Sequence, residues 1–143
     1  MNDITLEQAR LMISGAFDEG RRMGLAPLSV VVLDTGGHVK AFERDDGASN
    51  LRFEIAHGKA YGALGMGVGS RALMARAEQQ PYFVTAVSAA FGGALIPVPG
   101  GVLICNSEQT IIGAIGVTGD SSDNDEAAAV AGINAAGFQA RTG

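Results

Sequence analysis

Two residues that could hold a metal or a ligand lie one turn apart on a predicted helix of this 143-residue chain. His57 and Tyr61 both fall in the segment 51–64, whose spacing of small and apolar residues is typical of a helix. Positions four apart share one helix face, and the neutral imidazole is a common metal ligand. His57 is therefore the candidate metal ligand, and Tyr61 is a candidate ligand-binding residue. An ordinary polar histidine on a helix is the competing interpretation.

The same predicted helix carries Lys59, in surroundings poor in charge. If Lys59 is buried near a cleft, its pKa falls and the amine can bind an anion or act as a base. A surface lysine is the alternative. Asp125 lies near the start of a predicted terminal helix, where acidic residues also stabilise the positive end of the helix dipole. Lys59 and Asp125 form the candidate catalytic pair for acid–base chemistry.

Two glycine-containing turns could complete a site around this pair. The first turn precedes a predicted strand, and the second, 119–122, leads into the terminal helix. Backbone N–H groups of such turns and of a helix N-terminus can together cradle a carboxylate. We therefore expect a cleft between Lys59, the first turn and the start of the terminal helix. The candidate ligand-binding residues in it are Pro99, Gly100, Gly101, Gly119 and Glu126.

The elements that must position these residues alternate between helices and short strands. Thr5 and Gln8 form a capping-box pattern that begins a helix ending at Gly24. An apolar β-branched run, 28–34, predicts a central strand, and a glycine turn returns the chain as a second strand, 38–44. Further helices are predicted for 51–64, for a segment capped by Ser70, for 81–90 and for 123–139. Two or three strands are predicted within 94–117.

This order predicts an α/β fold in which a largely antiparallel sheet is flanked by helices on its faces. Gly58 and Gly62 lie one turn apart inside a predicted helix, where each glycine costs about 1 kcal/mol relative to alanine. Close approach by another backbone or by a ligand would explain them. The length of the chain and its short connections predict a single domain, 1–143.

Composition limits the classes of partner. The net charge is −5 and no basic stripe is present, which argues against nucleic acid and against an anionic membrane surface. No run approaches the roughly 20 apolar residues of a membrane span, and the first residues lack a secretory pattern, so we expect a cytoplasmic protein. Cys105 is the one cysteine and has no evident histidine partner for nucleophilic catalysis. Charged residues make up only 17%, which favours a homo-oligomer that covers neutral surface.

Six segments of the sequence resemble the GlcG/HbpS-type haem-binding family. The most specific are two glycine signatures, 97–102 and 113–119, followed by an acidic helix start, 123–127. The others are the first hairpin, 31–39, the segment 42–47 after it, and the helix around Lys59, 54–61. The resemblance extends over nearly the whole chain, and the last three segments occur in the family's order.

The resemblance implies a profilin-like α/β fold, assembly into dimers and larger rings, and haem as the candidate cofactor. It favours a small-ligand-binding protein that binds or degrades haem, with an accessory role in catabolism. The alternative is a cofactor-free enzyme acting on a small organic acid or an aromatic catabolite through Lys59 and Asp125. A purely structural oligomerisation module is the third hypothesis. His57 is a candidate from its own residue type and place, and not one that the resemblance implies.

Overall fold

A five-stranded antiparallel sheet forms the centre of the protein in the computed structural model, which describes residues 3–143. The strand order is β2-β1-β4-β3-β5, and every neighbouring pair is antiparallel. The predicted antiparallel sheet is therefore confirmed. The strands are β1 (Ser29–Leu33), β2 (Val39–Arg44), β3 (Gly101–Cys105), β4 (Ile111–Thr118) and β5 (Gln139–Arg141).

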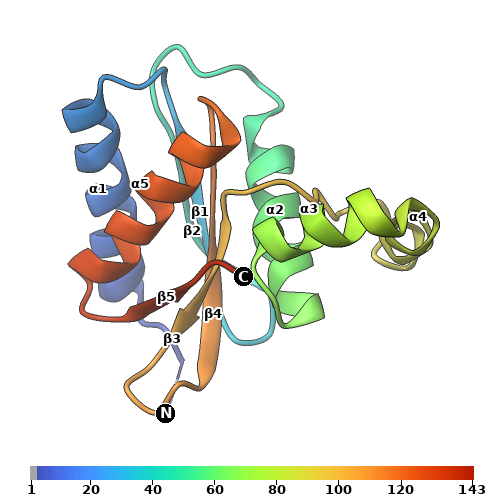
Figure 1. The fold of residues 1–143 in the computed structure, drawn as a ribbon. Helices are drawn as coiled ribbons and strands as arrows, with labels where there is room; N and C mark the ends of the chain where they lie inside the picture. The colour runs from blue at the N-terminus through green and yellow to red at the C-terminus, as the bar shows by residue number, and fades with distance from the viewer. Residues whose placement is uncertain (1–2) are drawn as a thin grey trace.

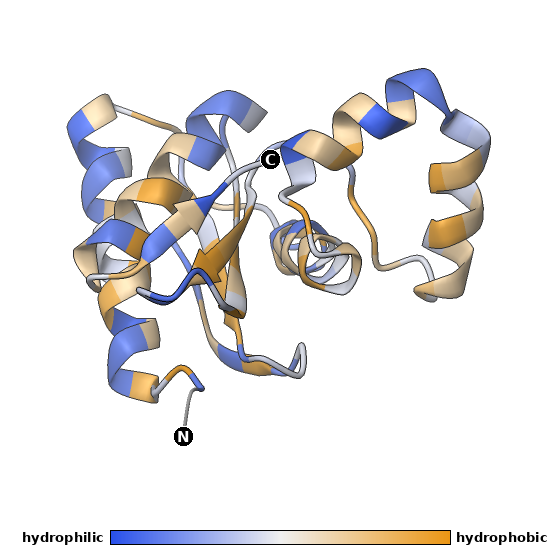
Figure 2. Ribbon diagram, turned by 60° about the horizontal axis from the view of Figure 1, so that its bottom comes forward, coloured by the Kyte–Doolittle hydropathy of each residue, from blue (hydrophilic) through white to orange (hydrophobic). Residues whose placement is uncertain are grey.

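Helices cover both faces of the sheet, as the sequence predicts (Figure 1). Helices α1 (Leu6–Met23) and α5 (Ser122–Ala135) lie side by side on one face, and α2 (Arg52–Met66) lies on the other. Strands β1, β3 and β4 are strongly apolar, whereas α1 carries many hydrophilic residues (Figure 2). Every residue of β1 and β3 is buried, because a central strand covered on both faces needs no polar side. Within the described residues, no helix is both long and apolar enough to cross a membrane.

The predicted capping box of α1 is confirmed. The Thr5 hydroxyl accepts a hydrogen bond from Gln8 N at 3.1 Å, and the Gln8 side chain accepts one from Thr5 N at 3.0 Å. At the other end Gly24 takes the left-handed conformation, with φ 69°. Local sequence thus sets both ends of α1 without help from the rest of the fold.

Helix α2 lies on the sheet almost backbone to backbone. A side chain at Gly116 would collide with the Ala56 carbonyl, and one at Gly101 would collide with the Lys59 carbonyl. Ala60 adds a third small residue to this contact. No bulky side chain separates α2 from the sheet at these positions. The backbone of the helix therefore lies close to the strands, and so do the α2 side chains that point away from them.

Helices α3 (Ser70–Gln79) and α4 (Pro81–Ala90) form an arm that extends away from the sheet (Figure 1). The arm has its own small apolar cluster, centred on Leu73, Val84 and Leu95. Ser70 was predicted to cap α3, but it is the first residue of the helix and Gly69 is the cap. The buried Ser70 hydroxyl instead accepts a hydrogen bond from Gly101 N at 2.7 Å and donates one to Gly101 O at 3.1 Å. These bonds attach the arm to the start of β3.

The prediction for the C-terminal third was wrong in two respects. The terminal helix ends at Ala135 and not near Gln139, because Gly137 adopts a left-handed φ of 82° and turns the chain. Segment 94–117 supplies two strands, within the predicted two or three, but a further strand that was not predicted, β5, follows the helix. It pairs with the edge of β3, with Leu103 opposite Arg141.

Candidate functional site

Lys59 and Asp125 form a buried ion pair between α2 and the start of α5. Lys59 Nζ lies 3.1 Å from Asp125 Oδ2 and donates a second hydrogen bond to Val117 O at 3.0 Å. Both side chains are only 2% exposed. The predicted proximity of the two residues is confirmed, but the pair is buried in the interior of the chain instead of standing at a surface.

The predicted glycine turns surround this pair, and the carboxylate that they cradle belongs to the protein. Asp125 Oδ1 accepts a hydrogen bond from Asp120 N at 2.9 Å, and the neighbouring Gly119 backbone also favours the charged form by lowering the pKa of the carboxyl. On the other side, a side chain at Gly100 would approach Lys59 Cδ and Nζ to 2.9 Å. The absence of a side chain at Gly100 thus makes room for Lys59, and the backbone N–H of Asp120 in the turn after Gly119 binds the Asp125 carboxylate.

Burial works against the charge of both groups in the pair. It lowers the pKa of Lys59, and the Asp125 carboxylate opposes that shift. Burial likewise raises the pKa of Asp125, and the Lys59 ammonium together with backbone N–H groups opposes the rise. The charged forms persist because each group supplies the counter-charge and the hydrogen bonds that water would otherwise provide.

The remaining residues predicted around this pair are not directed at a common space. Glu126 forms an ion pair with Arg71 of α3, and Asp123 binds the same guanidinium. Arg71 is 42% exposed, so this cluster lies at the surface. Pro99 is buried beside Gly100. The predicted acidic helix start is thus divided between one buried ion pair and one exposed ion-pair cluster.

His57 and Tyr61 belong to a row of aromatic rings on a different face of α2. The ring of His57 stacks between Phe53 and Tyr61, with centroid distances of 5.6 and 5.1 Å and interplanar angles of 27° and 16°. Phe42 of β2 meets Phe53 edge-on at 4.8 Å, and Phe91, at the end of α4, meets Tyr61 edge-on at 5.6 Å. The four-residue spacing along α2 produces this row.

Two surface hollows flank the aromatic row. The first, of about 270 Å³, we call the His57 hollow. It is lined by Phe53, Glu54, Ile55, His57, Gly92, Gly93, Ala94 and Ile96. The second, of about 330 Å³, we call the Tyr61 hollow. It is lined by Thr35, Gly36, Gly37, Tyr61, Leu64, Gly65, Ala90 and Phe91. Both volumes lie near the lower end of the usual range for small-ligand sites, roughly 300–1,000 Å³.

The imidazole of His57 is half-buried and chemically free. Among residues 3–143, none forms a hydrogen bond with either ring nitrogen, so the two stacked neighbours hold the ring in place. Burial lowers the pKa of His57 below the ordinary imidazole value of 6.5, which favours the neutral form that can ligate a metal. No group of three or more His, Cys, Asp or Glu side chains in the described part of the chain could hold a metal ion.

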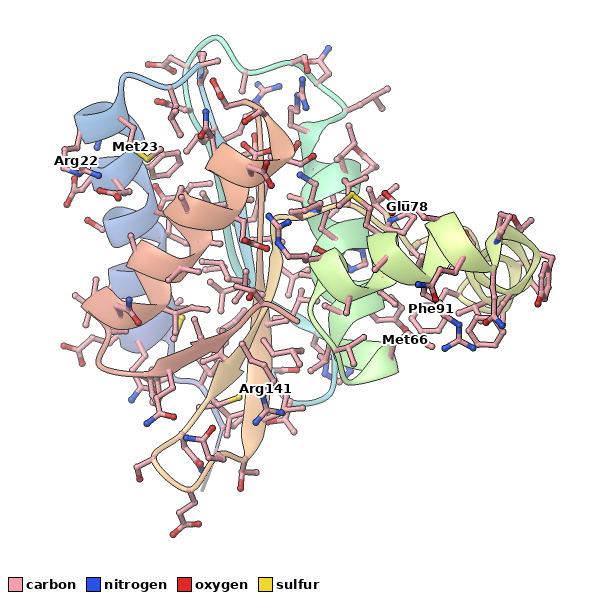
Figure 3. The ribbon with its side chains drawn as sticks, in the orientation of Figure 1. Arg22, Met23, Met66, Glu78, Phe91 and Arg141 are labelled. Carbon is pink, nitrogen blue, oxygen red and sulfur yellow. The ribbon has the colours of Figure 1, made fainter. Side chains whose placement is uncertain are left out.

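Phe53 and Phe91 were not predicted as site residues. The spacing Phe53-His57-Tyr61 was the signal that could have identified Phe53, because it places three rings on one face of a helix. Phe91 is different, since it reaches α2 from the far end of the arm. In Figure 3, the labelled Phe91 and Met66 lie where the arm joins α2. No local pattern indicates that contact.

The fold and this face define a class of α/β protein with aromatic-lined hollows beside a helix that is packed against an antiparallel sheet. Residues 4–134 match a family described as "Haem degrading protein HbpS-like". The match covers most of the chain, which therefore belongs to the HbpS-like family. The predicted resemblance is confirmed.

Solved structures show the same fold. A double mutant of HbpS from Streptomyces reticuli is 27% identical, with a TM-score of 0.77 over 92% of this chain and 85% of that one. Protein ORFY from Klebsiella pneumoniae has a TM-score of 0.85 at 24% identity, over 94% and 91% of the two chains. A complex of PduOC with haem has a TM-score of 0.83 at 20% identity, over 94% and 96%. The search of curated proteins gives no significant match.

Proposed function

We propose that this protein binds haem on the aromatic face of α2, with His57 as the axial ligand of the iron. The observation that carries the proposal is the half-buried imidazole of His57, which lies at the edge of a hollow and has no hydrogen-bond partner among the described residues. Histidine is the commonest protein ligand of haem iron. Bound haem would supply an iron centre for ligand binding and redox chemistry, and the protein would supply the imidazole and an apolar wall.

The lining of the two hollows fits a flat, mostly apolar macrocycle. The aromatic rings of Phe53, Tyr61 and Phe91 offer faces and edges for stacking. Neither lining contains a lysine or an arginine, so the carboxylates of a haem would remain in solvent. Haem is also consistent with the membership of the HbpS-like family and with the haem in the PduOC complex, whose fold this chain shares.

An absorption titration of the purified protein with haemin tests the proposal directly. We expect a shifted Soret band that saturates at one haemin per site, because imidazole coordination and burial in an aromatic environment both change the spectrum of free haemin. Absorbance across the Soret region is the measurement, and the same additions of haemin to buffer without protein are the reference. A featureless response that rises linearly with haemin would show that the protein has no specific site.

The affinity for haemin should depend on pH through His57. Because burial lowers the pKa of His57, the proton competes with iron only below 6.5. We expect constant affinity from pH 8 down to about 6.5 and then a fall of about tenfold per pH unit below the pKa of His57. The measurement is the Soret titration repeated between about pH 5 and 8.

The stability of the ligand-free protein should change in the same direction. The unfolded chain binds a proton at His57 near pH 6.5, whereas the folded chain does so only at lower pH. This contribution to stability is therefore present above pH 6.5 and is lost as the pH falls toward the pKa of folded His57.

For the pH dependence of haemin affinity, the His57→Ala variant is the control for effects of pH on haemin itself. An affinity that already weakens well above pH 6.5 would contradict a neutral, partly buried imidazole as ligand.

The buried Lys59–Asp125 pair supports a second candidate function, the acid–base enzyme predicted from sequence. The two groups lie 3.1 Å apart and burial perturbs both, a pattern often found at active sites. Both groups are buried and already bonded to partners inside the chain, however, so the geometry supports haem binding better. Haem degradation, the homo-oligomer, the cytoplasmic location and the role in catabolism stay predictions.

A further inference from the structure

We propose that residues 91–96, which we call the strap, form a movable wall that opens and closes the ligand site on α2. This inference rests on the proposed function for the identity of the ligand, but the mobility of the strap can be tested without one. The strap contributes residues to the linings of both hollows. A change in its position would therefore alter the two hollows together.

The strap is seated on a face of α2 that consists of glycines. Gly58, Gly62 and Gly65 are spaced four and three residues apart, which places them in one line along the helix. A methyl group at Gly62 would lie 2.9 Å from Leu95 Cγ, and one at Gly65 would lie 2.5 Å from the ring of Phe91.

At Gly58 a methyl group would collide with the side chain of Ile96. The sequence predicts close approach to Gly58 and Gly62 by another backbone or by a ligand; the structure shows another segment there, which approaches mainly through its side chains, Ile96 and Leu95. Each strap side chain occupies space that any residue other than glycine would fill. The glycine face of α2 therefore determines how closely the strap approaches the aromatic row.

Few bonds hold the strap on this seat. Ile96 N donates a hydrogen bond to Gly58 O at 3.1 Å, and the remaining contacts to α2 are van der Waals contacts of side chains. Leu95 and Phe91 pack into the cluster of the arm and not into either core of the sheet. The strap can therefore leave α2 with the arm while the sheet keeps its packing.

The backbone at Gly92 and Gly93 permits this movement. Both glycines are exposed and left-handed, with φ values of 66° and 84°, and no atom outside their chain neighbours lies within 4 Å of where a side chain would begin. Rotation of the chain there would break two local hydrogen bonds, from Gly92 N to Ala89 O at 3.0 Å and from Gly93 N to Ser88 O at 2.8 Å. At the other end of the arm, the bonds between Ser70 and Gly101 hold α3 to β3. Opening is thus confined to the strap end.

Closure of such a wall accounts for the size of the hollows. Each hollow in the ligand-free chain is near the lower limit for a small-ligand site. A ligand as large as haem would have to displace the strap on entry, and would then be held between it and the aromatic row. Release of the ligand would be limited by reopening of the wall.

Hydrogen exchange of the full-length protein, read by mass spectrometry, tests this inference. In the ligand-free protein, amides of residues 91–96 should exchange at least tenfold faster than those of β4, since they open without unfolding of the sheet. Gly65→Ala should raise strap exchange several-fold further by unseating Phe91, although alanine ordinarily stabilises a helix. Ile96→Ala, which leaves α2 unchanged, should act in the same direction.

Two comparisons complete the experiment. Gly65→Ala should have no added effect in a Phe91→Ala background, because the ring it displaces is gone. Saturating haemin should slow strap exchange at least tenfold in the unaltered protein. Strap amides as slow as those of β4, or strap exchange unaffected by Gly65→Ala and Ile96→Ala, would overturn the movable wall. If haemin gives no Soret change, the haem proposal fails, and the ligand-free comparison still decides the wall. Haemin that binds without slowing the strap would overturn its role in closing the site.

Discussion

Replacement of Lys59 by methionine is expected to lower the free energy of unfolding by about 3–5 kcal/mol, because it leaves the Asp125 carboxylate buried without its counter-charge. Methionine has a similar length and fills the space between Gly100 and α2. The loss therefore reports on the missing charge and its hydrogen bonds more than on a cavity. Urea unfolding followed by circular dichroism measures it. A loss below about 1 kcal/mol would show that water reaches the pair.

A double-mutant cycle separates the ion pair from the packing around it. Asp125→Asn keeps an oxygen for the Asp120 N–H, and on its own it should be destabilising because it leaves Lys59 unpaired. The variant with both substitutions should lose less than the sum of the single losses, by more than about 1 kcal/mol, because no buried charge remains. Arg71→Met is the matched control. It removes an exposed cation bound to the same helix, and it should cost only about 0–1 kcal/mol.

The cycle also bears on the enzyme hypothesis. A buried pair whose main role is to fix the start of α5 against α2 shows a large coupling energy in the ligand-free protein. A catalytic pair that opens to a substrate retains contact with water, and its removal changes stability little. A large coupling would thus assign Lys59 and Asp125 to the architecture of the protein. A small coupling would favour the acid–base role.

Those parts of the fold that depend on local sequence could be predicted. The ends of α1 follow from Thr5, Gln8 and Gly24, which act within one turn of the chain. The end of α5 could not be predicted in the same way, because the alanine-rich run continues toward Gln139 without a strong local stop other than Gly137. Strand β5 has only three residues, and it exists because β3 offers it a free edge. That is a tertiary effect.

The same division applies to the candidate sites. Residue types alone indicated that the glycine turns and the helix start suit a carboxylate, and the structure shows one there. The sequence could not reveal that Asp125 itself is this carboxylate, because that depends on the packing of α5 against α2. Similarly, Gly58 and Gly62 indicated a close contact, but the segment that makes it, around Ile96, lies far along the chain. Features that depend on the pattern within one helix could be predicted from the sequence, whereas contacts between distant segments could not.

Replacement of His57 by alanine is expected to weaken haemin binding at least a hundredfold, about 2.8 kcal/mol, and to remove the shifted Soret band. The imidazole lies at the centre of the aromatic row, and neither lining contains a cysteine or a second histidine that could replace it. The stability of the ligand-free protein should change little. The ring is only half-buried, and no hydrogen bond to it is present among residues 3–143.

Tyr61→Phe is the matched control, because it keeps a ring of nearly the same shape stacked on His57 and removes only the hydroxyl. It should bind haemin with nearly unchanged affinity and an unchanged spectrum. The reverse pattern, in which Tyr61→Phe removes the Soret shift and His57→Ala leaves it intact, would identify the phenol oxygen as the iron ligand. If both variants keep the shifted band, the iron is bound elsewhere, and Met66, where α2 meets the arm, is the next side chain to replace. In either case the assignment of His57 would be wrong, while the aromatic row would still account for the binding of a flat ligand beside α2.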